Sequence, residues 1–162
     1  MMPIVLQDGY MTNSSNDSVN GVLYMQGFNL IAVFDESCEK VLMCKRKNEP
    51  YKDLLNFVGG KIEQNEDGLT AAYRELFEET NITKDDIFLT HLMDFKYHLN
   101  GFYLEVYAGR LNKHIDAAGD ENELFWIALN QNFFDTSIYA GDGNIGHIMR
   151  HIELRKKDLL GI

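Results

Sequence analysis

The feature that most constrains this chain is the stretch 60–82, which reads GKIEQNEDGLTAAYRELFEETNI. Residues 69–80 contain neither Pro nor Gly, and their large apolar side chains recur at helical spacing. We therefore predict a helix that ends near Asn81, a residue that can adopt the left-handed cap conformation. The residues predicted to face the core are Leu69, Tyr73, Leu76 and Phe77.

The other side of this predicted helix is acidic. Glu75, Glu78 and Glu79 occupy positions i, i+3 and i+4, so their carboxylates lie close together and repel one another unless a cation joins them. Arg74 can neutralise one of them, with Glu78 at i+4 the expected partner. Alone, this spacing is typical of a solvated helix face. Oxygen ligands without cysteine also suit Mg²⁺ or Mn²⁺, so both interpretations stay open at this point.

The residues upstream of the helix favour the metal interpretation. Gly59 and Gly60 allow the backbone to approach a ligand closely, and Glu66 adds a further carboxylate. The whole stretch resembles the signature of the Nudix hydrolases: Gly, five residues, Glu, seven residues, Arg-Glu, an aliphatic, any residue, Glu-Glu, any residue, Gly, an aliphatic. The matching residues are Gly60, Glu66, Arg74, Glu75, Leu76, Glu78, Glu79 and Ile82. The final Gly of the signature is Asn81 here.

The resemblance to the Nudix family, and to its MutT-like pyrophosphohydrolases, implies an α/β fold. That fold is an α/β/α sandwich whose mixed β-sheet lies between the helix of the signature and a C-terminal helix. It also implies an enzyme that uses Mg²⁺ or Mn²⁺ to cleave a diphosphate linkage. The implied metal ligands are the Gly59 carbonyl, Glu75, Glu78, Glu79 and Glu121, with Glu123 as the alternative to the last. The implied catalytic residues are Glu78 and Glu79, one of which binds the attacking water, and Glu66 and Arg74, which orient the cluster.

Three residues outside the signature are predicted to bind substrate. Arg46 lies in a basic cluster after a predicted strand, where its planar guanidinium matches phosphate oxygens, although solvated cations explain the cluster equally well. Tyr97 can stack on a base or pack against its own sheet. Asn144 opens the C-terminal helix, where it is either an N-cap or, as in the Nudix nucleoside triphosphate hydrolases that the chain resembles, an amide that reads a purine edge.

These residues leave several substrates open. The short chain and Asn144 resemble hydrolases that convert a purine nucleoside triphosphate, including oxidised forms, to the monophosphate and pyrophosphate. Tyr97 resembles a tyrosine of dinucleoside polyphosphate hydrolases, whereas the lack of any Pro after Pro50 counts against an ADP-ribose hydrolase. A nucleotide-sensing module without catalysis is an alternative of another class. No carboxylate of the signature is missing, which counts against that alternative.

Composition limits the kinds of molecule that the chain is expected to bind. With 162 residues and a formal net charge of −10, the chain is expected to repel nucleic acid polymers and anionic membranes and to bind a small nucleotide through cations. Two cysteines and no apolar run near 18 residues predict a cytoplasmic protein. We expect an N-terminal extension over 1–20 and a single domain over 21–162, present as a monomer or homodimer.

Apolar runs and turn signals predict the remaining elements. The Asn100-Gly101 pair is the strongest short hairpin signal in the chain. The predicted strands are 28–34 and 40–46, paired as a hairpin, then 87–97 and 102–111, and finally 124–129. A single helix is predicted over 143–160.

Overall fold

The apolar run predicted as a buried strand becomes β1 (Gln26–Phe34), the central strand of a mixed sheet in a computed structural model that describes residues 25–119 and 122–161. The order of the strands is β3-β2-β1-β5-β4, and β6 pairs with β2. The other strands are β2 (Lys40–Lys45), β3 (Leu55–Asn56), β4 (Thr90–Tyr97), β5 (Phe102–Arg110) and β6 (Leu124–Ala128). The helices are α1 (Gly68–Thr80), α2 (Asn144–Leu154) and α3 (Lys156–Leu160).

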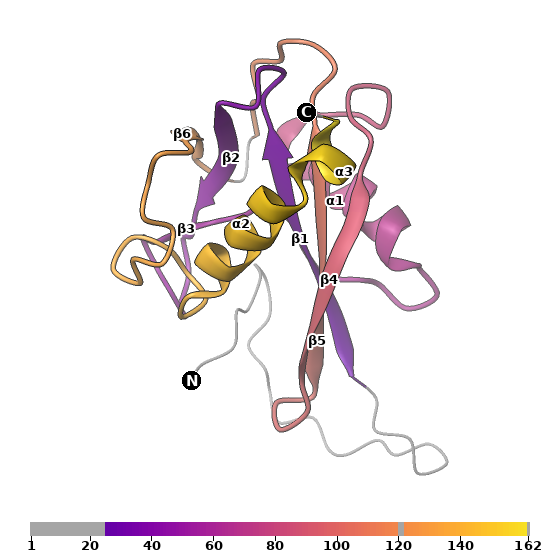
Figure 1. The fold of residues 1–162 in the computed structure, drawn as a ribbon. Helices are drawn as coiled ribbons and strands as arrows, with labels where there is room; N and C mark the ends of the chain where they lie inside the picture. The colour runs from indigo at the N-terminus through magenta and orange to yellow at the C-terminus, as the bar shows by residue number, and fades with distance from the viewer. Residues whose placement is uncertain (1–24, 120–121, 162) are drawn as a thin grey trace.

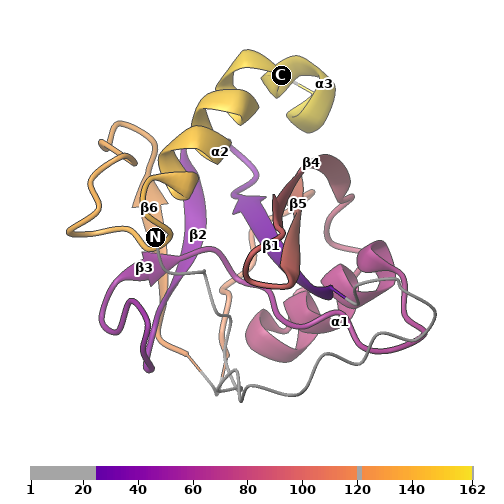
Figure 2. The ribbon, with the colours of Figure 1, turned by 90° about the horizontal axis from the view of Figure 1, so that it is seen from below.

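Helices cover both faces of this sheet. Figure 2 shows α1 on one side of the strands and α2 with α3 on the other, and in Figure 1 α2 crosses in front of the sheet. Each face has its own buried apolar cluster, because residues of β1 alternate between them: Leu30 faces one cluster and Ile31 the other. The predicted α/β/α sandwich with a mixed sheet is therefore confirmed.

The Asn100-Gly101 turn joins β4 and β5 as predicted. Gly101 adopts a left-handed φ of 70°, and its N–H donates to the Tyr97 carbonyl at 3.0 Å. The two strands pair antiparallel from Thr90 opposite Ala108 to Tyr97 opposite Phe102. The dipeptide thus fixed the register that brings Tyr97 to the end of the sheet.

The predicted hairpin of 28–34 with 40–46 is confirmed, but its paired region is short. Phe34 lies opposite Val41 where β1 and β2 pair antiparallel, and β2 also pairs with β6 along its length. The segment around the double glycine occupies this side of β1, since Val58 bridges Ile31. This segment places Gly59 and Gly60 against the central strand.

The prediction of which residues of α1 face the core is wrong in part. Leu76 is fully buried, but Leu69 is 40% exposed and Phe77 is 51% exposed. The helix instead faces the sheet through Ala71 and Ala72, together with Leu76, Glu79 and Thr80. Small side chains allow the helix to lie close to the sheet, so the bulky residues turn aside. The helix ends as predicted, with Asn81 in the left-handed conformation at φ 60°.

The C-terminal region forms two helices rather than the predicted one. α2 ends at Leu154, and Arg155 leaves the helical conformation at φ −123° and ψ 17° before α3 begins. The N-cap of α2 is Gly143, so Asn144 is the first helical residue and its side chain is free for other contacts.

Other expectations concern the ends and the thiols. The predicted extension 1–20 lies outside the described residues. Within 25–119 and 122–161, no helix has the length and apolar character needed to cross a membrane. Cys38 and Cys44 are free thiols.

Candidate active site

Arg74 holds three carboxylates of the signature together. Its Nε and Nη2 donate to the two oxygens of Glu66 at 3.0 and 2.8 Å, which is a bidentate pair. Its Nη1 donates to Glu75 at 2.7 Å and to Glu78 at 3.1 Å. Its Nη2 also donates to the Lys61 carbonyl at 3.0 Å, which ties the loop to the helix. The sequence predicted one partner, and the guanidinium reaches three.

The pKa values of the carboxylates in this cluster shift in opposite directions. Hydrogen bonding from Arg74 lowers the pKa of Glu66, and the same bonds raise the pKa of Arg74. For Glu75, burial raises the pKa despite the opposing effect of Arg74. Glu78 is the most exposed of the three, with 52% of its side chain accessible. Glu78 is therefore the carboxylate of this cluster that a water molecule can reach most easily.

Both glycines of the pair have close neighbours, which are backbone atoms at Gly59 and the Glu75 side chain at Gly60. A Cβ on Gly59 would lie 2.3 Å from the Asn29 carbonyl oxygen, and its φ of 140° also disfavours a side chain. A Cβ on Gly60 would lie 2.1 Å from the Glu75 carboxylate. The carbonyls of Val58 and Gly60 accept hydrogen bonds from β1, so the Gly59 carbonyl points away from that strand.

Glu79 points inward, unlike the other glutamates of α1. It is 4% exposed, its Oε2 accepts from the Gly59 N–H at 2.8 Å, and its Oε1 accepts from Asn122 Nδ2 at 3.2 Å. These bonds use two of about four lone-pair positions of the carboxylate. Sequence reasoning missed Asn122, because an asparagine 43 residues away carries no local signal.

The donor set fits a divalent cation of the magnesium class. It comprises carboxylates and a backbone carbonyl, which are hard oxygen ligands. Within the described residues no preformed cage of three metal-ligating side chains exists, since Arg74 holds Glu75 and Glu78 toward itself. A cation would share these carboxylates with Arg74.

The extra carboxylate predicted before β6 stays a prediction. Glu121 lies outside the described residues. Its alternative, Glu123, is exposed, and its carbonyl accepts from the Lys45 N–H at 2.9 Å.

Arg46 is more buried than the sequence predicted. It is 4% exposed, and its Nε donates to the Pro50 carbonyl at 2.9 Å. Burial lowers its pKa, whereas Glu79 and Tyr51 favour its charged form. Arg46 and Glu79 also line the same small cavity.

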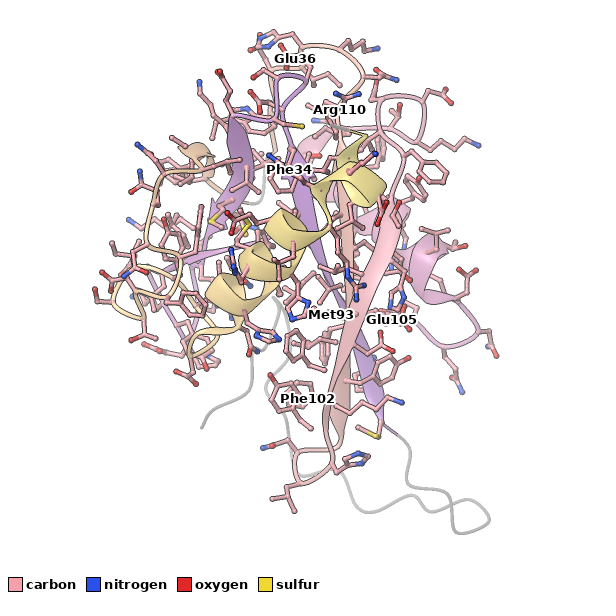
Figure 3. The ribbon with its side chains drawn as sticks, viewed as in Figure 1. Phe34, Glu36, Met93, Phe102, Glu105 and Arg110 are labelled. Carbon is pink, nitrogen blue, oxygen red and sulfur yellow. The ribbon has the colours of Figure 1, made fainter. Side chains whose placement is uncertain are left out.

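Tyr97 and Asn144 meet, although 47 residues separate them. Asn144 Nδ2 donates to the Tyr97 hydroxyl at 2.6 Å, and the Tyr97 ring stacks on Phe102 with a centroid distance of 4.5 Å. Phe102 marks the turn end of β5, away from Arg110 (Figure 3). Packing of Tyr97 within the fold is therefore observed, and stacking on a base stays a prediction.

Two residues that sequence reasoning missed lie beside this pair. The Tyr51 hydroxyl donates to Asp142 Oδ2 at 2.6 Å, joining two loops that are 91 residues apart. Burial and this bond raise the pKa of Tyr51, and the charge of Arg46 opposes the rise. Tyr51 and Asp142 both have positive φ, at 70° and 51°. Such conformations in non-glycine residues are common at binding sites, but they leave no mark in the sequence.

An α/β/α sandwich whose glutamates are held by an arginine beside a glycine pair defines the Nudix class of fold. The NUDIX domain family matches residues 23–146, and the chain belongs to this family. Its members are hydrolases of diphosphate linkages, so the enzyme class predicted from the sequence is confirmed at family level.

Individual relatives are more distant. The human protein nucleoside diphosphate-linked moiety X motif 6 is 44% identical over 54 residues, which cover 33% of this chain and 17% of that protein. A C. elegans Ap4A hydrolase structure has a TM-score of 0.66 at 19% identity and covers 83% of this chain and 99% of its own. MutT from Aliivibrio salmonicida and Vibrio cholerae gives 0.61 at 16%, over 79% and 96%. At such identities the structures establish the fold alone.

Proposed function

We propose that this protein is a Mg²⁺- or Mn²⁺-dependent hydrolase that converts a purine nucleoside triphosphate, oxidised forms included, to the monophosphate and pyrophosphate. The observation that carries the proposal is the carboxylate cluster, in which Arg74 donates to Glu66, Glu75 and Glu78 beside the glycine pair. Arg46 is the proposed phosphate contact, and it lines the same small cavity as Glu79.

The metal ligands of the proposal are the Gly59 carbonyl, Glu75, Glu78, Glu79 and Glu121. When bound, the cation supplies charge neutralisation to the diphosphate and lowers the pKa of water. The chain's own residues then divide the work. Glu78, the exposed carboxylate, or Glu79 accepts the proton of the attacking water, and Arg74 keeps Glu66 and Glu75 in place.

The nucleoside end would be recognised by Asn144 and Tyr97. The amide of Asn144 uses a donor on the Tyr97 hydroxyl, which leaves its carbonyl oxygen to accept from an N–H of a purine edge. The carboxylate of Asp142 lies in the same loop and is exposed. The bond from the Tyr51 hydroxyl holds this carboxylate in place, so Asp142 can serve as a second acceptor for the nucleoside.

The partners and location of the proposal follow from charge and thiols. The substrate is a small nucleotide, neither a nucleic acid polymer nor a membrane, because a net charge of −10 repels polyanions that no cation bridges. The free thiols Cys38 and Cys44 are typical of a reducing, cytoplasmic environment.

The test is release of phosphate or pyrophosphate from a panel of nucleotides with Mg²⁺ or Mn²⁺. The panel contains purine and pyrimidine triphosphates, oxidised dGTP, a dinucleoside polyphosphate and ADP-ribose. Turnover of purine triphosphates above the rest, lost in Glu78→Gln and kept in the exposed control Glu63→Gln, is the expected result. Faster turnover of the dinucleoside polyphosphate or of ADP-ribose would overturn the proposed substrate assignment. Tight binding without any turnover would indicate a sensor.

A further inference from the structure

The side chain of Asn56 is an anomaly at the edge of the active site. Asn56 lies in β3, opposite Cys44 of β2, and is 1% exposed. Neither its Nδ2 nor its Oδ1 has a hydrogen-bond partner among the described residues. Because an amide carries two donor hydrogens and an acceptor, a buried and unmatched one destabilises a fold unless something satisfies it.

A small cavity adjoins this amide. Its volume is about 10 Å³, close to the least that one water molecule requires. Its lining residues are Cys44, Arg46, Asn56, Phe57, Gly59, Glu79 and Asn122. The polar side chains among them are themselves at least nine-tenths buried: Arg46 is 4% exposed, Glu79 4% and Asn122 6%.

The cavity lies against the contacts that hold Glu79. The carboxylate accepts from the Gly59 N–H through one oxygen and from Asn122 through the other. The Cys44 thiol is directed elsewhere, to the Phe57 carbonyl at 3.6 Å. The unmatched amide and the Glu79–Asn122 pair therefore line the same small space.

We propose that Asn56 is a positioning residue for the hydrolytic reaction, acting through one water molecule held in this cavity between its amide and the Glu79–Asn122 pair. The proposal rests on the proposed function. Such a water ties β3 to the carboxylate of Glu79, so that the carboxylate keeps one orientation beside Gly59. Asn56 does not touch the substrate in this account.

The first test needs neither metal nor nucleotide. The Gly59 amide donates to Glu79, so its proton chemical shift and exchange rate in an NMR spectrum report the position of the carboxylate. Asn56→Leu removes the polar atoms at similar size, and Asn56→Ser keeps a hydroxyl if the leucine variant fails to fold. We expect both to move the Gly59 signal, and the leucine variant to do so more. The control is Cys44→Ala, which changes the same cavity without altering the amide and should leave the signal in place.

The second test measures Mn²⁺ affinity and the steady-state constants. Loss of a residue that orients a metal ligand typically costs about 10–100-fold, so in Asn56→Leu we expect kcat and Mn²⁺ affinity to fall by about tenfold or more with little change in KM. A folded Asn56→Leu with an unchanged Gly59 signal and unchanged Mn²⁺ affinity would overturn the proposal. A raised KM at normal kcat would also overturn it, because that result indicates direct substrate contact.

The two proposals can fail separately. If the unmodified protein neither binds Mn²⁺ nor hydrolyses any nucleotide, the proposed function fails. The Gly59 signal would still decide whether Asn56 orients Glu79.

Discussion

The two ends of the proposed site are built in opposite ways. The carboxylate cluster comes from one continuous stretch, and Arg74 joins Glu66, Glu75 and Glu78 over no more than eight residues. The nucleoside end joins Tyr97 to Asn144 and Tyr51 to Asp142 across 47 and 91 residues. The first is a property of a loop and a helix, and the second exists only once the sheet and α2 are in place.

This difference separates chemistry from selectivity. Changes in the carboxylate cluster should reduce turnover of every nucleotide, because the diphosphate is common to all of them. Changes at the nucleoside end should alter affinity for some nucleotides and leave the chemical step intact. Each prediction below can break or sharpen this separation.

The largest effect is expected for Glu78→Gln. The substitution removes a charge but keeps the size of the side chain, and kcat should fall by roughly 10²–10³-fold for all substrates. Steady-state kinetics across the panel measures this. Near-normal turnover, or a loss restricted to one nucleotide, would break the comparison.

Arg74→Met should follow, with kcat lower by about 10–100-fold because three carboxylates lose their common donor. Arg74→Lys should recover little of this, since an ammonium cannot reproduce a planar fork that is bidentate to Glu66. Mn²⁺ titration by calorimetry supplies a reading independent of turnover. Full recovery in the lysine variant would show that charge alone, without geometry, is sufficient.

A smaller effect is expected at the nucleoside end. Asn144→Ala and Tyr97→Phe each remove one side of a 2.6 Å hydrogen bond, and KM for purine triphosphates should rise by about 3–10-fold at unchanged kcat. Inorganic tripolyphosphate, which lacks a nucleoside, is the control substrate and should respond to neither variant. An equal fall in kcat for both substrates would contradict the separation.

The smallest effect concerns a residue outside both regions. Asp86 accepts from Lys113 at 2.7 Å and from Thr83, and these bonds lower its pKa to about 2. Its contribution to stability is therefore present above the ordinary carboxyl pKa and is lost as the pH falls toward 2. Asp86→Asn should lower the melting temperature by a few degrees at pH 7, and the difference should vanish near pH 2. Kinetic constants at 25 °C should not change.

Local signals predicted the carboxylate cluster well. The helix, its end at Asn81 and the gathering of Arg74 with the glutamates follow from spacing within one turn or two. The same reasoning failed for Leu69 and Phe77, because it assumed that bulky side chains face the core. Here the helix lies so close to the sheet that Ala71 and Ala72 occupy the buried face.

The nucleoside end was only partly predictable. Asn144 and Tyr97 were selected as separate candidates, but their contact depends on the register of β4 and on the place where α2 begins. Tyr51, Asp142 and Asn122 carry no local pattern, since each acts through a partner distant in sequence. Such residues become visible only when tertiary structure brings the partners together.

The one departure from the family signature has a role of its own. Asn81 replaces the final glycine and, besides adopting the left-handed cap, donates from its side chain to the Ala118 carbonyl at 2.7 Å. Next to it, Gly119 lies so close that a Cβ would be 1.8 Å from the Glu79 carbonyl oxygen. Asn81→Gly would restore the family residue and keep the helix end, but it would remove the hydrogen bond to the loop at Ala118. Replacing Asn81 by the glycine of the family signature would therefore weaken the attachment of this loop to the helix.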